Sequence, residues 1–324
     1  MSDKQSLRII YMGTPDFAVE PLKKLVEGGY NVVGVITMPD KPIGRHQNEL
    51  SSSPVKQYAV ANGLPVLQPA KLKDPDFIEE LRNLKADLQI VVAFRMLPEV
   101  VWNMPRLGTF NLHAALLPQY RGAAPINWAI INGDTETGIT TFFLDHDIDT
   151  GSVIQRVPVP ILDTDNAEDV HDKLMYLGSD LVIETVDNIL KDNIHPIPQS
   201  ELTTDEPLRP APKIFKETCR IDWNKGVKYT YDFVRGLSPY PAAWTELTCN
   251  GKKSVLKIYA ATKEFNDSPT EPLGTVITDG KTFLKVALSD GYLKLETIQL
   301  AGKKRMQTTD FLRGFHPSED MRVE

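Results

Sequence analysis

Cysteines and long hydrophobic runs are both scarce in this sequence. Only Cys219 and Cys249 are present, and they form no CxxC pair. This argues against a disulfide framework and a thiolate metal site, and it predicts a reduced, cytoplasmic protein. No window approaches the ~18 uncharged apolar residues that a membrane-spanning helix requires. The opening residues also lack the layout of a signal peptide. We therefore expect no association with a membrane.

A glycine-rich nucleotide motif is also missing. The turn after the first β-rich run reads "YMGTPDF" and contains only Gly13. A dinucleotide site needs G-x-G-x-x-G at this place, because the backbone must approach the pyrophosphate closely. An NAD-dependent oxidoreductase is therefore disfavoured.

The first two thirds of the chain alternate strand and helix patterns. The β-rich runs cover residues 7–12, 31–37, 87–94, 108–113 and 138–145. Helical patterns separate them, and a long one at 170–193 closes the region. This order predicts an α/β, Rossmann-like parallel sheet covered on both faces, with ligands bound beyond the carboxyl ends of its strands.

The last third of the chain has a different pattern. Residues 194–213 are rich in proline and lack periodicity, which is typical of an extended linker. Short strands separated by turns follow a helical pattern at 224–237, and they lie near residues 242–249, 253–261, 273–278, 282–288 and 291–299. We expect a catalytic domain at 1–193, a linker at 194–213, and a small antiparallel, OB-like β-barrel at 214–324.

Charge is distributed unevenly along the chain. Residues 1–206 hold 17 lysines and arginines against 29 aspartates and glutamates, whereas residues 207–324 hold 19 against 14. The first part therefore carries a net charge of −12 and the second +5, out of −7 for the whole chain. A basic end on an acidic chain suggests that a polyanion binds there, although an ordinary solvated surface has the same charge pattern.

Two polar residues interrupt the otherwise apolar segment "FNLHAALLP". Asn111 and His113 are two positions apart in a predicted strand, so their side chains share a face. His113 ends the strand at the edge where ligands bind. A buried amide or imidazole without partners costs on the order of 1–3 kcal/mol, so these side chains have either structural partners or a function.

The third candidate lies in "FFLDHDIDTGSVI", which follows another strand. Counted from Asp145, a calcium loop requires glycine at position 6 and glutamate at position 12. This segment has Thr150 and Arg156 at these positions, so its spacing does not fit a calcium loop. Asp145 and Asp147 fit a solvated acidic turn. Asp149 begins a tight "DTG" turn, and we expect this loop to leave the same sheet edge as His113.

Asn111, His113 and Asp149 together suit acyl transfer to an amine that a substrate supplies. A neutral histidine takes a proton from the attacking amine. A carboxylate holds the ring's tautomer and stabilises its cation. One amide donor to an oxyanion is commonly worth about 3–4 kcal/mol of barrier. No metal is needed for this chemistry.

Several motifs resemble one known family over essentially the whole chain. They are "MGTPDFAVEPL", "NLHAALLPQYRGAAPI", "DTG" at 149–151, "RIDW" at 220–223 and "GKKRM" at 302–306. The central motif is similar to folate-dependent formyltransferases, and the last narrows the resemblance to the methionyl-tRNA formyltransferase family.

This resemblance implies transfer of a formyl group from 10-formyltetrahydrofolate to the α-amine of methionyl initiator tRNA, for translation initiation. It implies that Asn111, His113 and Asp149 are the catalytic trio. The co-substrate contacts that it implies, including a strand end expected to line the pterin pocket, are Phe94, Arg95, Met96, Leu97, Ala115, Leu116, Leu117 and Pro118.

The resemblance also implies contacts with tRNA. The long loop 38–54 leaves the same sheet edge, and Arg45 in it is a candidate for the acceptor stem. Arg121 is a candidate for the terminal adenosine or a phosphate, although a local salt bridge explains it equally well. Lys303, Lys304 and Arg305 suit a phosphate track. We expect a monomer.

Three other functions fit part of the pattern. An enzyme that formylates an amino-sugar nucleotide shares the Asn/His/Asp set and needs no basic track. A hydrolase of formylfolate releases formate without an acceptor, but it leaves the basic barrel unexplained. A non-catalytic RNA-binding protein explains the basic end but not the trio.

Overall fold

The computed structural model describes residues 4–43, 49–203 and 205–324. Arg45, one of the predicted tRNA contacts, lies outside the described residues. The chain forms two compact units. The first comprises Met1–Gly122, Gly138–Val159 and His171–Pro210, and the second comprises Ala123–Thr137, Pro160–Val170 and Ala211–Glu324.

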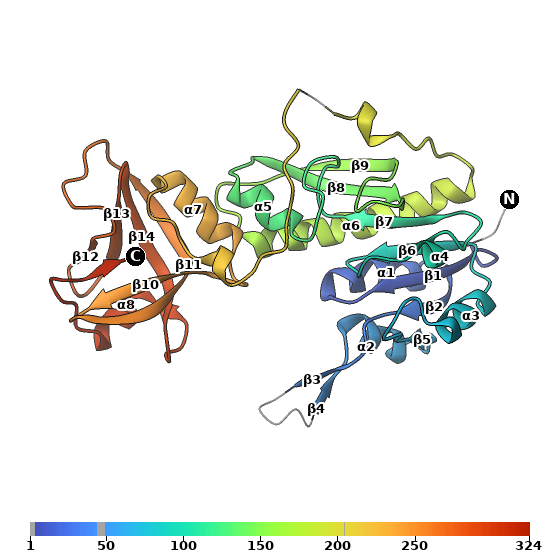
Figure 1. Ribbon diagram of the computed structural model, residues 1–324, viewed down its shortest axis with the longest axis horizontal. Coiled ribbons are helices and arrows are strands. Elements are labelled where there is room, and N and C mark those ends of the chain that lie inside the picture. The colour runs from blue at the N-terminus through green and yellow to red at the C-terminus, as the bar shows by residue number, and fades with distance from the viewer. Residues whose placement is uncertain (1–3, 44–48, 204) are drawn as a thin grey trace. The chain divides into compact units, whose positions relative to one another are not determined.

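The first unit is built on a seven-stranded sheet in the order β5-β2-β1-β6-β7-β8-β9 (Figure 1). Its strands are β1 (Arg8–Gly13), β2 (Asn31–Ile36), β5 (Val66–Leu67), β6 (Leu88–Val92), β7 (Thr109–His113), β8 (Glu136–Phe143) and β9 (Val153–Pro160). The first five of these in sheet order pair in parallel. Apart from the sheet, a two-stranded hairpin consists of β3 (Lys41–Ile43) and β4 (Glu49–Ser51).

The prediction of a Rossmann-like parallel sheet is confirmed for these five strands, but β8 runs antiparallel to β7. A parallel return requires a long crossover that packs on the sheet. The only α-helix between β7 and β8 is the seven-residue α5 (Pro125–Ile131), and it packs on helix α7 (Val227–Gly236) of the second unit instead. The chain therefore re-enters the sheet in the opposite direction.

The helices of the first unit start at conventional signals. Ser53 caps α2 (Pro54–Ala61) by accepting a hydrogen bond from the Lys56 amide at 3.1 Å. Asp74 caps α3 (Pro75–Asn83) in the same way. Such caps satisfy backbone donors that have no partner within the helix. The other helices associated with this unit are α1 (Val19–Glu27), α4 (Glu99–Trp102), η1 (Asp16–Ala18), η2 (Gln199–Glu201) and α6 (Ala167–Leu190), which begins in the second unit.

The second unit contains an antiparallel sheet in the order β12-β13-β14-β11-β10-β16, with β15 paired to β14 (Figure 1). Its strands are β10 (Ala243–Cys249), β11 (Lys252–Phe265), β12 (Val276–Thr278), β13 (Leu284–Leu288), β14 (Gly291–Leu300), β15 (Met306–Gln307) and β16 (Arg322–Val323). The two ends of this path meet at a bridge between Thr275 and Arg322, which nearly closes the sheet. The predicted small antiparallel barrel is therefore confirmed.

Helix α7 packs on β11 and β14 of this barrel, and its Phe233 and Val234 join the hydrophobic core. Helix α8 (Thr308–Gly314) and η3 (Glu217–Cys219) complete the unit. None of the helices that the structure describes is both long and apolar enough to span a bilayer.

The predicted linker at 194–213 is more than a spacer. Most of it belongs to the first unit, where Ile197 forms an antiparallel bridge with Val153 in β9. In addition, α5 and residues 160–170 group with the C-terminal part of the chain. A compact unit is defined by its contacts, whereas a domain is defined by independent folding, so the predicted domain boundaries stay a prediction.

Candidate active site

His113 lies at the end of β7 and is almost entirely buried, with 6% of its surface exposed. Its Nε2 is 2.8 Å from the carbonyl oxygen of Tyr120, and its ring meets Phe142 edge-on. A carbonyl oxygen only accepts hydrogen bonds, so Nε2 carries the proton. In the neutral ring, Nδ1 is therefore the atom with a free lone pair.

Asp149 faces that free nitrogen. Its Oδ2 is 3.8 Å from His113 Nδ1, and the same oxygen accepts a hydrogen bond of 2.9 Å from the Gly122 amide. The separation from His113 is that of an ion pair rather than of a direct hydrogen bond. The imidazole and the carboxylate are thus brought together, as expected from the sequence, but the Tyr120 carbonyl is what fixes the ring.

The loop that carries Asp149 takes an unexpected route. Phe143, the last residue of β8, pairs with Phe110 near the start of β7, so β8 ends away from His113. The prediction that this loop leaves the same sheet edge as His113 is therefore wrong, because β8 is antiparallel. Asp149 reaches His113 because the loop between β8 and β9 folds back.

Backbone geometry makes this return possible. A Cβ at Gly151 would lie 1.7 Å from the Phe143 carbonyl oxygen, so only glycine fits there. Asp149 and Tyr120 both have left-handed backbones, with φ of 55° and 59°. This conformation is uncommon for residues other than glycine and tends to occur at functional sites.

Asn111 occupies the middle of β7, two residues before His113. Its Oδ1 is buried and has no hydrogen-bond partner among the described residues. An unpaired buried acceptor costs about 1–3 kcal/mol. The amide therefore has hydrogen-bonding capacity that the described part of the chain does not use.

The loop after His113 is fixed by the neighbouring strands. The Thr140 hydroxyl in β8 donates to the Ala115 carbonyl at 2.6 Å and accepts from the Leu117 amide at 3.2 Å. The side chains of Ala115, Leu117 and Pro118 are buried, and Leu116 packs on Gly138. These four predicted co-substrate residues therefore present mainly backbone atoms.

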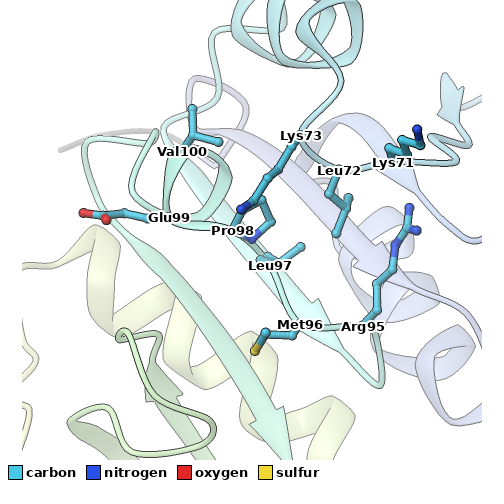
Figure 2. Close-up of a pocket in the computed structure, with 9 residues that line it drawn as sticks. All are labelled: Lys71, Leu72, Lys73, Arg95, Met96, Leu97, Pro98, Glu99 and Val100. Carbon is cyan, nitrogen blue, oxygen red and sulfur yellow. The ribbon is translucent and has the colours of Figure 1, made fainter.

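A cavity of about 630 Å³ lies where the chain leaves β6 (Figure 2). It is lined by Lys71, Leu72, Lys73, Arg95, Met96, Leu97, Pro98, Glu99 and Val100. Three of the predicted co-substrate residues, Arg95 to Leu97, therefore line one cavity. Because β6 and β7 are parallel neighbours, this segment leaves the sheet at the same edge as His113.

The side chains of this segment differ in environment. Met96 is 73% exposed and Leu97 is buried, while Phe94 packs partly against the core beneath. Arg95 donates hydrogen bonds to the backbone carbonyls of Pro69 and Ala70. Burial lowers the pKa of the Arg95 guanidinium below its ordinary value.

Two of the three cations that line this cavity lie on one side of it. Lys71 and Arg95 lie together there in Figure 2, with Glu99 on the other side. Lys71 and Lys73 are exposed and follow the short strand β5. Sequence reasoning missed both lysines, because a two-residue strand gives no periodic signal that would place them at the carboxyl edge.

Arg121 is held by a glutamine. Its Nε and Nη2 donate to Gln199 Oε1 at 3.0 and 2.7 Å. The Arg121 guanidinium is therefore held by a neutral amide oxygen, whereas the alternative prediction for it was a local salt bridge. Gln199 lies in the predicted linker, where nothing in the sequence distinguishes it from other polar residues.

The three predicted phosphate contacts of the second unit are all exposed. Lys303, Lys304 and Arg305 occupy the turn between β14 and β15. The Arg305 guanidinium lies over the Tyr259 ring, 4.2 Å from its centroid, and the ion pairs of the described residues involve none of the three. The turn is thus a cluster of uncompensated positive charge beside an aromatic ring.

Within residues 4–43, 49–203 and 205–324, no group of three or more His, Cys, Asp or Glu side chains is placed to hold an ion.

Comparison with known proteins assigns the family. A family model described as "Formyl transferase" matches residues 7–186, and one described as "Formyl transferase, C-terminal domain" matches residues 213–316. The methionyl-tRNA formyltransferase of Phocaeicola vulgatus is 70% identical over 324 residues, 99% of this chain and 100% of that protein. The methionyl-tRNA formyltransferase of Bacteroides thetaiotaomicron is 66% identical over 321 residues, 99% of each chain.

Solved structures agree in fold. An N-formyltransferase from Helicobacter canadensis, in complex with folinic acid and dTDP-3-aminofucose, has a TM-score of 0.64 at 18% identity over 93% of this chain and 100% of that one. HypX from Aquifex aeolicus with tetrahydrofolic acid has a TM-score of 0.61 at 18% identity over 98% of this chain and 51% of that one. Such identities show the fold alone, whereas the curated relatives match throughout. The chain belongs to the methionyl-tRNA formyltransferase family.

Proposed function

We propose that this protein transfers a formyl group from 10-formyltetrahydrofolate to the α-amine of methionine carried on initiator tRNA. The observation that carries the proposal is the 66–70% identity, over 99% of the chain, to proteins named methionyl-tRNA formyltransferase. The candidate active site supplies a way for the chain's own residues to catalyse the reaction.

His113 Nδ1 is the proposed general base. Its lone pair is free because Nε2 donates to the Tyr120 carbonyl. As the α-amine attacks the formyl carbon, this nitrogen takes the proton that the amine loses. The ring then becomes a cation beside Asp149 Oδ2, 3.8 Å away, and the carboxylate stabilises it. The proposed role of Asp149 is therefore electrostatic, whereas the Tyr120 carbonyl orients the ring.

Asn111 is the proposed oxyanion donor. It shares a face of β7 with His113, and its amide oxygen, Oδ1, has no hydrogen-bond partner among the described residues. Its Nδ2 donates to the formyl oxygen as negative charge develops there. A donor that is already in place costs no reorganisation at the moment of reaction.

The cavity after β6 is the proposed folate site. The bound co-substrate supplies an activated formyl group. When the tetrahedral intermediate collapses, the bond between the formyl carbon and N10 breaks, and the His113 cation returns its proton to N10 as tetrahydrofolate leaves. The cavity offers apolar wall from Leu72 and Leu97 and exposed cations at Lys71 and Lys73, which fits a molecule with an aromatic body and glutamate carboxylates. Backbone groups of residues 94–97 are the proposed hydrogen-bonding partners for the edge of the pterin ring.

Removing both lysines should weaken binding of the co-substrate. We expect Lys71→Ala/Lys73→Ala to raise KM for 10-formyltetrahydrofolate about 5- to 30-fold, since each exposed charge pair contributes up to ~1 kcal/mol. Steady-state kinetics with the mono- and triglutamate forms measure this, and the increase should be larger for the triglutamate. Lys23→Ala/Lys191→Ala removes the same charge elsewhere in the first unit and serves as the matched control. An unchanged KM for both forms would remove the lysines from the proposed site.

The basic turn at Lys303, Lys304 and Arg305 is the proposed phosphate track for tRNA. We expect the triple alanine variant to lower kcat/KM for methionyl-tRNA about 10- to 100-fold and to flatten its salt dependence, because fewer counterions are released on binding. The KM for folate should not change. Lys252→Ala/Lys281→Ala is a control in the same unit. A salt dependence equal to that of the unaltered protein would argue against the track.

The molecule that accepts the formyl group distinguishes this function from its alternatives. The unaltered protein, given 10-formyltetrahydrofolate, should formylate charged initiator tRNA at least ten times faster than charged elongator tRNA or a nucleotide-linked amino sugar. Preference for the amino sugar would make it a sugar formyltransferase. Formate release at an equal rate without any acceptor would make it a hydrolase. A monomeric state and a cytoplasmic location remain part of the proposal, to be tested by sedimentation and cell fractionation.

A further inference from the structure

Gln199 connects two parts of the candidate active site that are distant in sequence. Its side chain is 3% exposed and uses both ends of its amide. Nε2 donates to the carbonyl oxygens of Asp149 and Gly151 at 2.8 and 2.9 Å. Oε1 accepts the two hydrogen bonds from Arg121 described above. The Gln199 side-chain amide thus makes all of its hydrogen bonds with Arg121, Asp149 and Gly151.

The segment around Gln199 is itself firmly attached to the first unit. Ile197 and Val153 exchange two backbone hydrogen bonds of 2.8 Å, which joins the segment to the start of β9. On the other side of Gln199, Leu202 packs against the cluster formed by Leu117, Phe142 and Val153. The amide of Gln199 is therefore presented from a rigid support.

The Asp149 turn needs such support. Asp149 has a left-handed backbone, which costs an aspartate free energy that other contacts must offset. The Gln199 amide ties the carbonyls on both sides of Thr150, and this fixes the turn in the conformation that places the Asp149 carboxylate near His113. The Gly122 amide then holds the carboxylate itself.

We propose that Gln199 is a positioning residue that holds the Asp149 turn against His113 and orients Arg121 toward the acceptor. The proposal deepens the proposed function and rests on it for the identity of the acceptor. Gln199 touches no reacting atom and acts through Asp149 and Arg121.

Two substitutions separate the two ends of the amide. Gln199→Leu keeps the approximate size and removes both interactions. Gln199→Glu keeps an oxygen acceptor for Arg121 but, when ionised, cannot donate to the two carbonyls. Gln155→Leu is the matched control, because Gln155 also bridges two elements, through hydrogen bonds with Glu184 and Thr185, away from the turn.

We expect Gln199→Leu and Gln199→Glu to lower kcat for formylation of methionyl-tRNA about 10- to 100-fold, because small displacements of catalytic groups are costly. KM for folate should stay within twofold in both variants, whereas KM for the tRNA should rise in Gln199→Leu and stay unchanged in Gln199→Glu, which keeps the acceptor for Arg121. Arg121→Ala should instead raise KM for the tRNA and leave kcat within threefold. If Gln199 had a purely structural role, its substitution would lower the melting temperature. The loss of activity would then not be confined to kcat with an unchanged KM for folate.

A second measurement does not depend on activity. Hydrogen exchange at the Gly122 amide, whose partner is Asp149 Oδ2, should accelerate at least tenfold in Gln199→Leu and stay unchanged in Gln155→Leu. If kcat falls and Gly122 exchanges faster, the proposal is supported. Either a kcat within twofold of the unaltered protein or unchanged exchange at Gly122 overturns it. Failure of the unaltered protein to formylate methionyl-tRNA would contradict the proposed function, while the exchange experiment still tests Gln199.

Discussion

His113→Ala is expected to lower kcat for formyl transfer about 10³-fold, with KM for both substrates within threefold. The expectation follows from the proposed base at Nδ1, since general acid–base catalysis contributes typically about 10²- to 10⁴-fold. Initial rates with charged initiator tRNA and 10-formyltetrahydrofolate measure it. Free imidazole in the buffer should restore part of the rate, because it fits the space that the ring vacates.

The matched control is His146→Ala. The Nδ1 atom of His146 also lies 3.8 Å from a carboxylate, that of Glu99, but its side chain is 68% exposed. Each histidine therefore has a carboxylate at the same distance, but the two differ in burial, and His113 lies in a strand whereas His146 lies in a loop. Equal losses in the two variants, or a His113→Ala rate within threefold of the unaltered protein, would contradict the assignment of the base.

Much of the fold could be predicted from the order of apolar runs. The parallel strands up to β7 have continuous hydrophobic stretches, and the turns of the barrel contain glycine and aspartate at regular spacing. The direction of β8 could not be predicted in this way. It depends on where α5 packs, and a contact with α7, distant in the sequence, leaves no local pattern.

The same limit applies to the candidate site. Asn111 and His113 could be predicted because their spacing within one strand fixes a common face. The approach of Asp149 to His113 was expected for a reason that proved wrong, since the loop folds back and does not leave the shared edge. Tyr120 and Gly122 act through backbone atoms, and Gln199 acts from a proline-rich segment without periodicity. Contacts of this kind do not depend on a residue type that a sequence pattern can single out.

Asn111→Ala is expected to lower kcat and kcat/KM equally, by about 10²- to 10³-fold, because the amide is proposed to bind the formyl oxygen only as charge develops on it. KM for folate should hold within twofold. Asn111→Asp, which keeps the size but offers no donor when ionised, should be at least as slow. Asn31→Ala is the control, since Asn31 also lies in a strand and donates to a backbone carbonyl, that of Gln5.

The stability of Asn111→Ala should not fall with its activity, and this distinguishes a catalytic amide from a structural one. Asn111 Oδ1 is buried without a partner among the described residues, so the unliganded protein gains no hydrogen bond from it. Removing such a group relieves a penalty of about 1–3 kcal/mol, which offsets the packing that the substitution loses. The free energy of unfolding, measured by denaturant titration, should therefore stay within about 1 kcal/mol of the unaltered value or rise. A loss of activity that follows a loss of stability, or a raised KM at constant kcat, would make Asn111 a structural or substrate-binding residue instead.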